Sequence, residues 1–297
     1  MIRSKQLFSM VSLVASLGCA SGVAQAAVTL DLTTVGASGV INGATYTQMP
    51  LQPVGTGVID PFVRIGMQGS AGKEYVEGYN TTVDNVFNNS NEDNYNRAVT
   101  VGEIGITTVG GQNVMRFILD INQTSANPQL NLDEVQIFIS TSPNQSTEAF
   151  TGTGLVDLSN SYLVYRMDAG DTGNKVTLDY SLNSGSGSGD MYLDIPVADL
   201  IGAFNAGGTL FDTDPERNSA YIYLYSKFGS DPYNNNDGFE EWTYVKGGKF
   251  GEPPCTTPDC GGGGGGGNAP EPGSMALAGL ALAGMAAVRR RRTTGNA

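Results

Sequence analysis

The chain has 297 residues, with 29 Asp and Glu against 16 Lys and Arg, which gives a net charge of −13 at pH 7. A surface this acidic repels nucleic acid and anionic lipid, which argues against a nucleic-acid partner. The sequence also contains no histidine. This absence removes the Ser-His-Asp and Cys-His catalytic arrangements and most zinc sites.

The acidity is concentrated in the middle of the chain. Six of the 16 basic residues (Arg3, Lys5 and Arg289 to Arg292) and one of the 29 acidic residues (Glu271) belong to the two ends. Residues 27–269 therefore carry 10 basic and 28 acidic residues, a net charge of about −18. Such a charge favours solubility, and it can also attract divalent cations.

The N-terminus has the three parts of a secretory signal peptide. Arg3 and Lys5 form a positive start, and residues 7–17 form an apolar run. We expect residues 1–26 to be removed by signal peptidase and the following domain to fold outside the cytoplasm. The residues that mark the cleavage site are Ala24, Ala26 and Ala27.

Residues 27–250 break into short runs rich in Val, Ile, Thr, Tyr and Phe, separated by Gly, Asn, Asp and Pro, which is typical of an antiparallel sheet protein. Asn42-Gly43 and Gly110-Gly111 predict two tight hairpins. The second hairpin joins residues 98–109 to residues 112–121. The other predicted strands are residues 28–34, 133–140, 161–167, 175–181, 190–195, 219–228 and 239–245.

The returning arm of the second hairpin alternates between an apolar and a mixed face. Its predicted core residues are Met115, Phe117, Leu119 and Ile121. One helix is predicted after Pro196, where apolar residues recur at helical spacing until Gly207-Gly208. The expected fold is all-β: an antiparallel two-sheet sandwich of jelly-roll type with one short helix.

Few enzyme classes are compatible with this sequence. Glycoside hydrolysis remains open because it needs only two carboxylates. Glu240 and Glu241 are strand neighbours, so they should point to opposite faces and do not form a catalytic pair. We expect a protein that is not an enzyme, with no catalytic residues.

Two oxygen-rich turns are candidates for Ca²⁺, the only cofactor that the sequence suggests. The first contains Asp212, Asp214 and Glu216 at alternate positions, and the second runs from Asp168 to Asn174. The alternative explanation is that these side chains serve turn geometry and bond to the local backbone.

Aromatic residues form a third candidate site. Tyr221, Tyr223 and Tyr225 alternate along one predicted strand, and Trp242 lies on the next. If these rings were exposed in a row, they could stack on sugar faces. The alternative is that they are core residues with a polar tip.

Residues 251–269 form a linker rich in Pro, Cys and Gly. Cys255 and Cys260 are five positions apart, and in an oxidising compartment they would form a small-loop disulfide. Two thiols without histidine are a poor zinc site.

The last 28 residues contain Pro270-Glu271-Pro272, an uncharged apolar run from Met275 to Val288, and the cluster Arg289, Arg290, Arg291 and Arg292. The run can enter a bilayer as a helix, but at about 1.5 Å per residue it reaches only about 21 Å of a core about 30 Å thick. The arginines would hold its end in the cytoplasm. The order of these parts resembles the PEP-CTERM sorting signal of Gram-negative bacteria.

That resemblance implies processing by an exosortase-type membrane protease and delivery to the cell surface or an extracellular polysaccharide matrix. Residues 219–245 also resemble the last strand pair found before this signal in many exported proteins of uncharacterised function. Tails of this kind are sometimes labelled the C-terminal domain of an ice-binding protein. The flat threonine array of an ice-binding face is absent here.

We therefore expect an exported, non-enzymatic protein of the surface or the exopolysaccharide or biofilm matrix, held by the membrane at least transiently. A calcium-dependent glycan-binding module is the alternative, and a glycosidase-like enzyme is the third.

Overall fold

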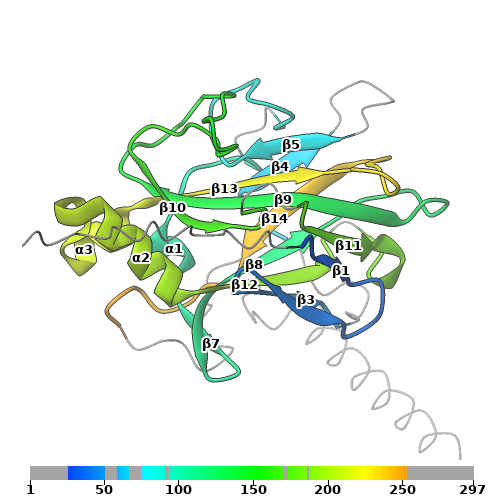
Figure 1. The fold of residues 1–297 in the computed structure, drawn as a ribbon, viewed down its shortest axis with the longest axis horizontal. Helices are drawn as coiled ribbons and strands as arrows, with labels where there is room; N and C mark the ends of the chain where they lie inside the picture. Colours follow the sequence, from blue (N-terminus) through cyan, green and yellow to red (C-terminus); the bar gives the residue numbers. More distant parts are fainter. Residues whose placement is uncertain are drawn as a thin grey trace, which may run out of the picture.

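The computed structural model of the protein describes residues 26–50, 59–66, 75–90, 94–169, 173–185 and 187–252. These residues form two β-sheets that face each other, with helices gathered at one end (Figure 1).

The first sheet is built around a long central strand, β9. Its order is β1-β11-β9-β13-β5, with β10 also pairing β9 and β6 also pairing β13. The strands are β1 (Thr29–Asp31), β5 (Val76–Tyr79), β6 (Val99–Thr100), β9 (Gln129–Ser140), β10 (Ser161–Arg166), β11 (Lys175–Asp179) and β13 (Tyr221–Phe228).

The second sheet has the order β2-β3-β12-β8-β14-β4, and β7 also pairs β8. Its strands are β2 (Ser38–Ile41), β3 (Ala44–Gln48), β4 (Val63–Gly66), β7 (Thr107–Val109), β8 (Gln112–Asp120), β12 (Met191–Pro196) and β14 (Phe239–Tyr244). The helices are α1 (Val101–Ile104), α2 (Val197–Gly207) and α3 (Asp214–Ser219), with short 3₁₀ turns at Tyr180–Leu182 and Gly208–Phe211.

The main core lies between the two sheets and takes apolar side chains from both. The predicted core face of β8 is confirmed: Met115, Phe117, Leu119 and Ile121 are all at most 1 % exposed. They meet inward residues of β9 such as Ile137. The two-sheet sandwich therefore follows from the period-two alternation of these strands.

Both predicted hairpin turns are confirmed. Asn42 and Gly43 have φ values of 48° and 89°, and Ile41 pairs with Ala44 across them. Gly110 and Gly111 also have positive φ, and β7 pairs β8 on either side of them. The predicted helix after Pro196 is confirmed as α2.

Three expectations were wrong in detail. The described residues form three α-helices, whereas one short helix was expected. The sheets are not purely antiparallel, because β1 pairs with β11 in parallel. The predicted strand over residues 98–109 is broken by α1, since the Thr100 side chain accepts a bond from the Glu103 backbone N–H and the Glu103 side chain accepts one in return, which begins a helix there. The jelly-roll connectivity stays a prediction.

The outer face of the first sheet carries a second apolar cluster under the loop of residues 141–160. It includes Tyr79, Phe138 and Tyr223, together with Val156 and Leu158 from the loop. The Tyr223 hydroxyl donates to the Ser142 carbonyl oxygen at 2.7 Å. This loop covers part of the outer face, and a recess lies beside it.

Candidate functional site

The recess is a cleft of about 520 Å³ on the outer face of the first sheet. Its floor is formed by β5, β9, β10, β11 and β13, and its wall includes Phe150 and Gly154 of the covering loop. Among its lining residues are four acidic side chains, three basic side chains and three aromatic rings. The sequence analysis did not predict this combination, because its residues come from five separate strands.

Strand register places these side chains in rows across the sheet. Lys227 on β13 lies opposite Glu77 on β5 and Glu134 on β9. Tyr225 lies opposite Gln136, which in turn faces Arg166 on β10. Because residues two apart on a strand share a face, both rows point into the same cleft.

A β-bulge adds a further carboxylate to the cleft. Lys227 pairs with Glu134, but Phe228 pairs with Leu132, so Asp133 has no partner across the ladder. The bulge lets the consecutive residues Asp133 and Glu134 both line the cleft. Simple alternation would have placed them on opposite faces, which is why the sequence alone did not reveal this pair.

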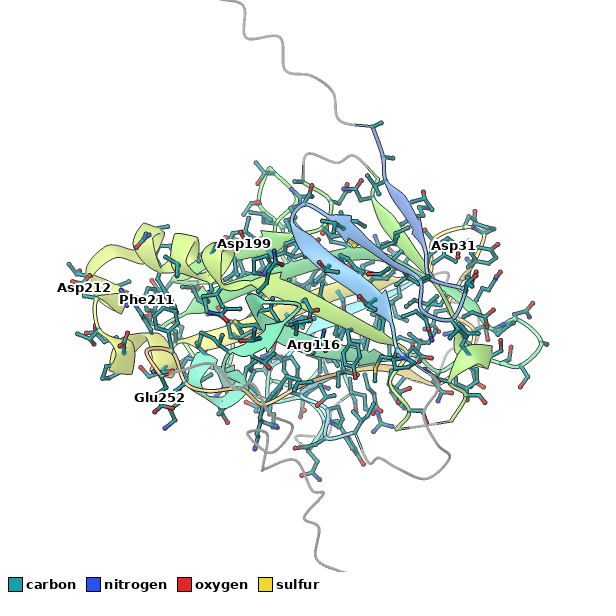
Figure 2. The ribbon with its side chains drawn as sticks, turned by 90° about the horizontal axis from the view of Figure 1, so that it is seen from below. Asp31, Arg116, Asp199, Phe211, Asp212 and Glu252 are labelled. Atoms are coloured by element: carbon teal, nitrogen blue, oxygen red, sulfur yellow. The ribbon has the colours of Figure 1, made fainter. Side chains whose placement is uncertain are left out.

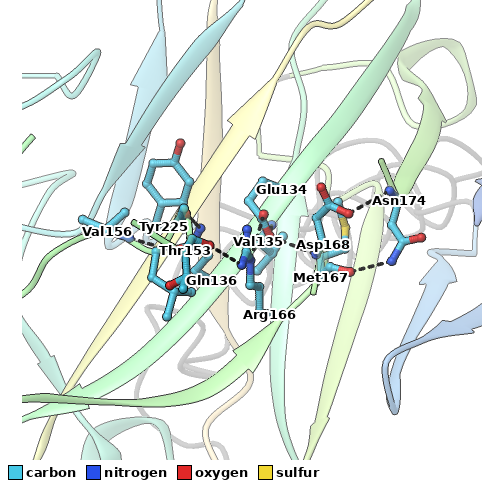
Figure 3. Close-up of polar contacts among 12 residues, drawn as sticks. Glu134, Val135, Gln136, Thr153, Val156, Arg166, Met167, Asp168, Asn174 and Tyr225 are labelled. Atoms are coloured by element: carbon cyan, nitrogen blue, oxygen red, sulfur yellow. Dashed lines mark hydrogen bonds and ion pairs between the residues drawn. The ribbon is translucent and has the colours of Figure 1, made fainter. Parts of the chain in front are cut away.

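Each of these carboxylates already accepts hydrogen bonds. Asp133 accepts from the Ser230 backbone N–H at 2.8 Å and from its hydroxyl. Glu134 accepts from the Asp168 backbone N–H at 3.2 Å and from Arg166 Nε at 3.5 Å (Figure 3). Burial raises the pKa of Asp133 above its usual range and raises the pKa of Glu134 to about 7. The cleft therefore holds a proton on Glu134 at about neutral pH more readily than an exposed glutamate would.

The basic side chains supply hydrogen-bond donors beside these acceptors. Lys175 Nζ donates to the Ser230 hydroxyl oxygen at 3.2 Å, and Arg166 donates to the Thr153 carbonyl oxygen at 2.7 Å. Lys227 Nζ lies 4.4 Å from the centre of the Tyr75 ring. Cations and carboxylates are thus interleaved, and the cleft has no single dominant sign of charge.

Aromatic rings complete the cleft. Tyr75 is 48 % exposed and Phe150 is 43 % exposed. The Phe150 ring packs edge-on against Tyr225, with centroids 5.8 Å apart, and the Tyr225 hydroxyl donates to Glu77. Exposed rings beside paired donors and acceptors can bind a ligand that has apolar faces and many hydroxyl groups.

The predicted aromatic row is not an exposed platform. Tyr221, Tyr223 and Tyr225 do share one face of β13, but Tyr223 and Tyr225 are at most 2 % exposed because the covering loop packs on them. Trp242 is fully buried in the core between the sheets, where Nε1 donates to the Ser226 hydroxyl oxygen at 3.0 Å. Of these four residues, only Tyr225 lines the cleft.

The predicted calcium turn lies at the start of helix α3. The Glu216 carboxylate accepts from the Thr213 backbone N–H at 2.9 Å, which completes a capping box, and Asp214 pairs with Arg217 at 3.2 Å. Asp212 lies at the tip of the helical end of the domain (Figure 2). Over the described ranges, no group of three or more His, Cys, Asp or Glu side chains is placed to hold a metal ion. The capping box accounts for Glu216 and the ion pair for Asp214, and calcium binding by Asp212, Asp214 and Glu216 stays a prediction.

In the second oxygen-rich turn, the described residues Asp168, Gly173 and Asn174 form local hydrogen bonds. Asp168 accepts from the backbone N–H groups of Gly173 and Asn174 at 2.7 and 3.2 Å. The Asn174 side chain donates to the Met167 carbonyl oxygen and accepts from the Val28 backbone N–H. Asn174 therefore links Val28, just before β1, to Met167, just after β10. Figure 3 shows its bonds to Met167 and Asp168.

Glu240 and Glu241 point to opposite faces, as expected. Glu240 is fully buried and accepts from Gln123 and Asn235, whereas Glu241 lies on the outer face and pairs with Arg64 at 3.3 Å. They are not a catalytic pair.

Several predicted features lie outside the described residues. They are the signal peptide up to Gln25, with Ala24 of the cleavage site, the Cys255 and Cys260 pair, and the tail with Pro270, Glu271, Pro272 and Arg289 to Arg292. Within the ranges that the structure covers, none of the helices has the length and apolar character needed to cross a membrane.

Comparison with known proteins identifies the tail. Residues 268–292 match the PEP-CTERM protein-sorting motif. No curated protein and no solved structure matches the chain significantly. The motif marks an exported protein that is processed at the membrane by an exosortase-type system. The chain thus carries a PEP-CTERM sorting signal behind a β-sandwich domain.

Proposed function

We propose that this protein is a non-enzymatic component of the cell surface or of the extracellular polysaccharide matrix. Signal peptidase removes residues 1–26, and an exosortase-type protease acts on the tail. The observation that carries the proposal is the sorting motif at residues 268–292. The strong negative charge of the mature part supports a soluble, exported domain.

The physical properties of the tail fit a transient anchor. Proline on both sides of Glu271 stops a helix from extending through the tripeptide, so this backbone stays accessible to a protease. Carrying Arg289 to Arg292 through hydrocarbon would cost several kcal/mol for each side chain, so they stay on the cytoplasmic side. The short apolar run between them holds the precursor only until it is cut.

Sorting is tested by mass spectrometry of the protein recovered from the envelope and medium of the native host. Wild-type protein should lack the peptide from Met275 to Ala297. A variant with Arg289 to Arg292 changed to Gln should keep it, because the stop signal is lost. Recovery of wild-type protein that always retains the complete tail would contradict processing.

For the β-sandwich, the cleft supports binding of a neutral polysaccharide. Exposed rings of Tyr75 and Phe150 offer surfaces for sugar faces, and the interleaved Lys227 and Glu134 offer donors and acceptors for hydroxyl groups. An acidic polysaccharide would meet carboxylates in the cleft and a strongly negative domain around it. A neutral glycan is therefore the ligand class that suits this site best.

The hydrogen bonds of the cleft support binding over hydrolysis. Ser230 donates to Asp133, Arg166 to Glu134, and Tyr225 to Glu77. A glycosidase needs one carboxylic acid and one carboxylate that face the glycosidic bond with room to act. Carboxylates held by the protein's own donors are positioned to accept hydrogen bonds from a bound sugar instead.

Binding is tested with the native host's extracellular polysaccharide, separated by anion exchange into neutral and acidic fractions. The mature domain should bind the neutral fraction and release no reducing sugar from it. Tyr75→Ala should weaken binding about tenfold, a loss of about 1.4 kcal/mol. Tyr192→Ala is the matched control, since Tyr192 also packs on a cation, Arg116 at 4.2 Å, but on the outer face of the other sheet.

Three results would overturn this assignment. They are tighter binding to the acidic fraction, equal losses in the Tyr75 and Tyr192 variants, and steady release of reducing sugar. The last would establish the glycosidase-like alternative.

A further inference from the structure

Two buried carboxyl groups lie side by side on the outer face of the second sheet, away from the cleft. Asp120 ends β8, and Asp190 immediately precedes β12. Met191 pairs with Leu119, so the antiparallel register places Asp190 opposite Asp120. The Asp190 backbone N–H donates to the Leu119 carbonyl oxygen at 2.7 Å, and both aspartates are only 3 % exposed.

Each carboxyl group is only half satisfied. Oδ2 of Asp120 accepts from the Gly187 backbone N–H, and Oδ2 of Asp190 accepts from the Ile121 backbone N–H, both at 2.8 Å. The Oδ1 atom of each is buried and has no hydrogen-bond partner. An oxygen left in this state destabilises the folded protein, and more so if it is charged.

The surrounding charges make this arrangement more costly. Glu241 on β14 lies opposite Asp120 on its other side, so three acidic residues form a row across three strands. Arg64 pairs with Glu241 at 3.3 Å, and within the described part of the chain no Lys or Arg forms an ion pair with Asp120 or Asp190. Like charges directly opposite each other destabilise a sheet.

Burial also raises the pKa of Asp120 to about 7. It raises the pKa of Asp190 well above its usual range, and the nearby charges of Asp120 and Glu240 raise the pKa of Asp190 further. A buried charge without a partner is neutralised either by a proton or by a cation.

We propose that the Oδ1 atoms of Asp120 and Asp190 bind one Ca²⁺ ion. Carboxylate oxygens are hard ligands, and Ca²⁺ accepts backbone carbonyl groups and water as the rest of its six to eight ligands. The two carboxylates would therefore supply the charged ligands of the site, and among the described residues no third His, Cys, Asp or Glu joins them. Mg²⁺ fits less well, because it demands near-ideal octahedral geometry, whereas Ca²⁺ tolerates irregular arrangements of ligands.

Gly187 and Gly189, just before β12, lie next to the site. Asn183 Nδ2 donates to the Gly189 carbonyl oxygen at 3.0 Å, and Gly187 provides the N–H that holds Asp120. Bound calcium would therefore stabilise Gly187 together with the ends of β8 and β12.

The test uses mature wild-type protein that has been freed of metal with EDTA and dialysed into pH 7.5 buffer. Isothermal titration with CaCl₂ should give one ion per molecule. Saturating CaCl₂ should raise the melting temperature by about 5 °C, since the ion binds only the folded state, and MgCl₂ should raise it less. Asp190→Asn should abolish both responses, because it replaces one charged ligand while keeping the side-chain shape.

Asp214→Asn is the matched control, because it removes the same charge from the capped helix at the other candidate position and should keep the full calcium response. Absence of heat and of a melting shift in wild-type protein would overturn the proposal. So would a response that survives in the Asp190 variant or disappears in the Asp214 variant.

A second measurement does not depend on the folding of a variant. Trp242 is the only tryptophan and lies opposite Leu119, next to Asp120. Tb³⁺ that replaces Ca²⁺ at this site should therefore emit when tryptophan is excited, and CaCl₂ should quench the emission by competition. Tb³⁺ that binds without such emission would place the ion elsewhere and overturn the proposal.

Discussion

Phe117→Ala tests the central packing of the sandwich. The Phe117 side chain is fully buried between the sheets, and its ring centroid lies 6.1 Å from that of Phe62. Its cross-strand neighbours are Leu193 and Tyr244. Removing such a ring typically costs about 3 to 5 kcal/mol, from lost transfer free energy and the cavity left behind. The free energy of unfolding should fall by this amount in urea titrations.

Phe150→Ala provides the matched control for the same chemical change. Phe150 is 43 % exposed and packs on the rings of Phe87 and Tyr225, so its loss should cost below about 1.5 kcal/mol. Val114→Ala removes less volume from a site that is 3 % exposed and should cost about 1.5 kcal/mol. Equal losses for Phe117 and Phe150, with unchanged urea dependence, would refute the assignment of the core face.

Three further predictions concern polar groups. Because the pKa of Glu134 is raised in the folded state, its contribution to stability is present below about pH 4.5 and is lost as pH rises through about 7. Glu134→Gln should remove this loss, which is at most about 3 kcal/mol. In urea titrations, the stability of the variant relative to wild type should therefore increase between pH 5 and pH 8. A relative decrease would contradict the burial argument. Arg116→Gln should destabilise by about 2 to 4 kcal/mol, because it breaks a pair of bonds at 2.6 and 2.7 Å and leaves Asp194 buried without its cation. A loss in urea of less than about 1 kcal/mol would show that this pair behaves like an exposed one. Thr213→Ala should cost about 1 kcal/mol through loss of the helix cap, in calorimetry with and without calcium alike; a loss seen only with calcium would restore a metal role for this turn.

Features decided by near neighbours in the sequence were predicted correctly. The turns at Asn42-Gly43 and Gly110-Gly111 depend on residues that tolerate positive φ, and the facing of Phe117 depends on a period of two. Helix α2 follows from local apolar spacing. The sorting motif is a linear signal that needs no folded partner, so the sequence alone was sufficient to identify it.

Only the tertiary structure decided how the polar and aromatic residues are used. Tyr223 is covered by a loop about 80 positions away, as its bond to Ser142 shows, and no local pattern reports such a contact. Glu216 forms a capping box with Thr213 at the start of α3. The sequence at this turn was compatible both with calcium binding and with such local hydrogen bonds. The cleft depends on a bulge at Asp133 that alternation cannot predict.

The proposed calcium site also depends on contacts between residues that are distant in the sequence. Asp120 and Asp190 are 70 positions apart, and neither stands out in the sequence. Strand pairing brings them together, and burial leaves one oxygen of each without a partner. The sequence alone determined the sorting signal of this protein and the alternation of its strands, because both are local properties. The positions at which the domain can bind a ligand arise from contacts between distant segments, and therefore only the folded chain contains them.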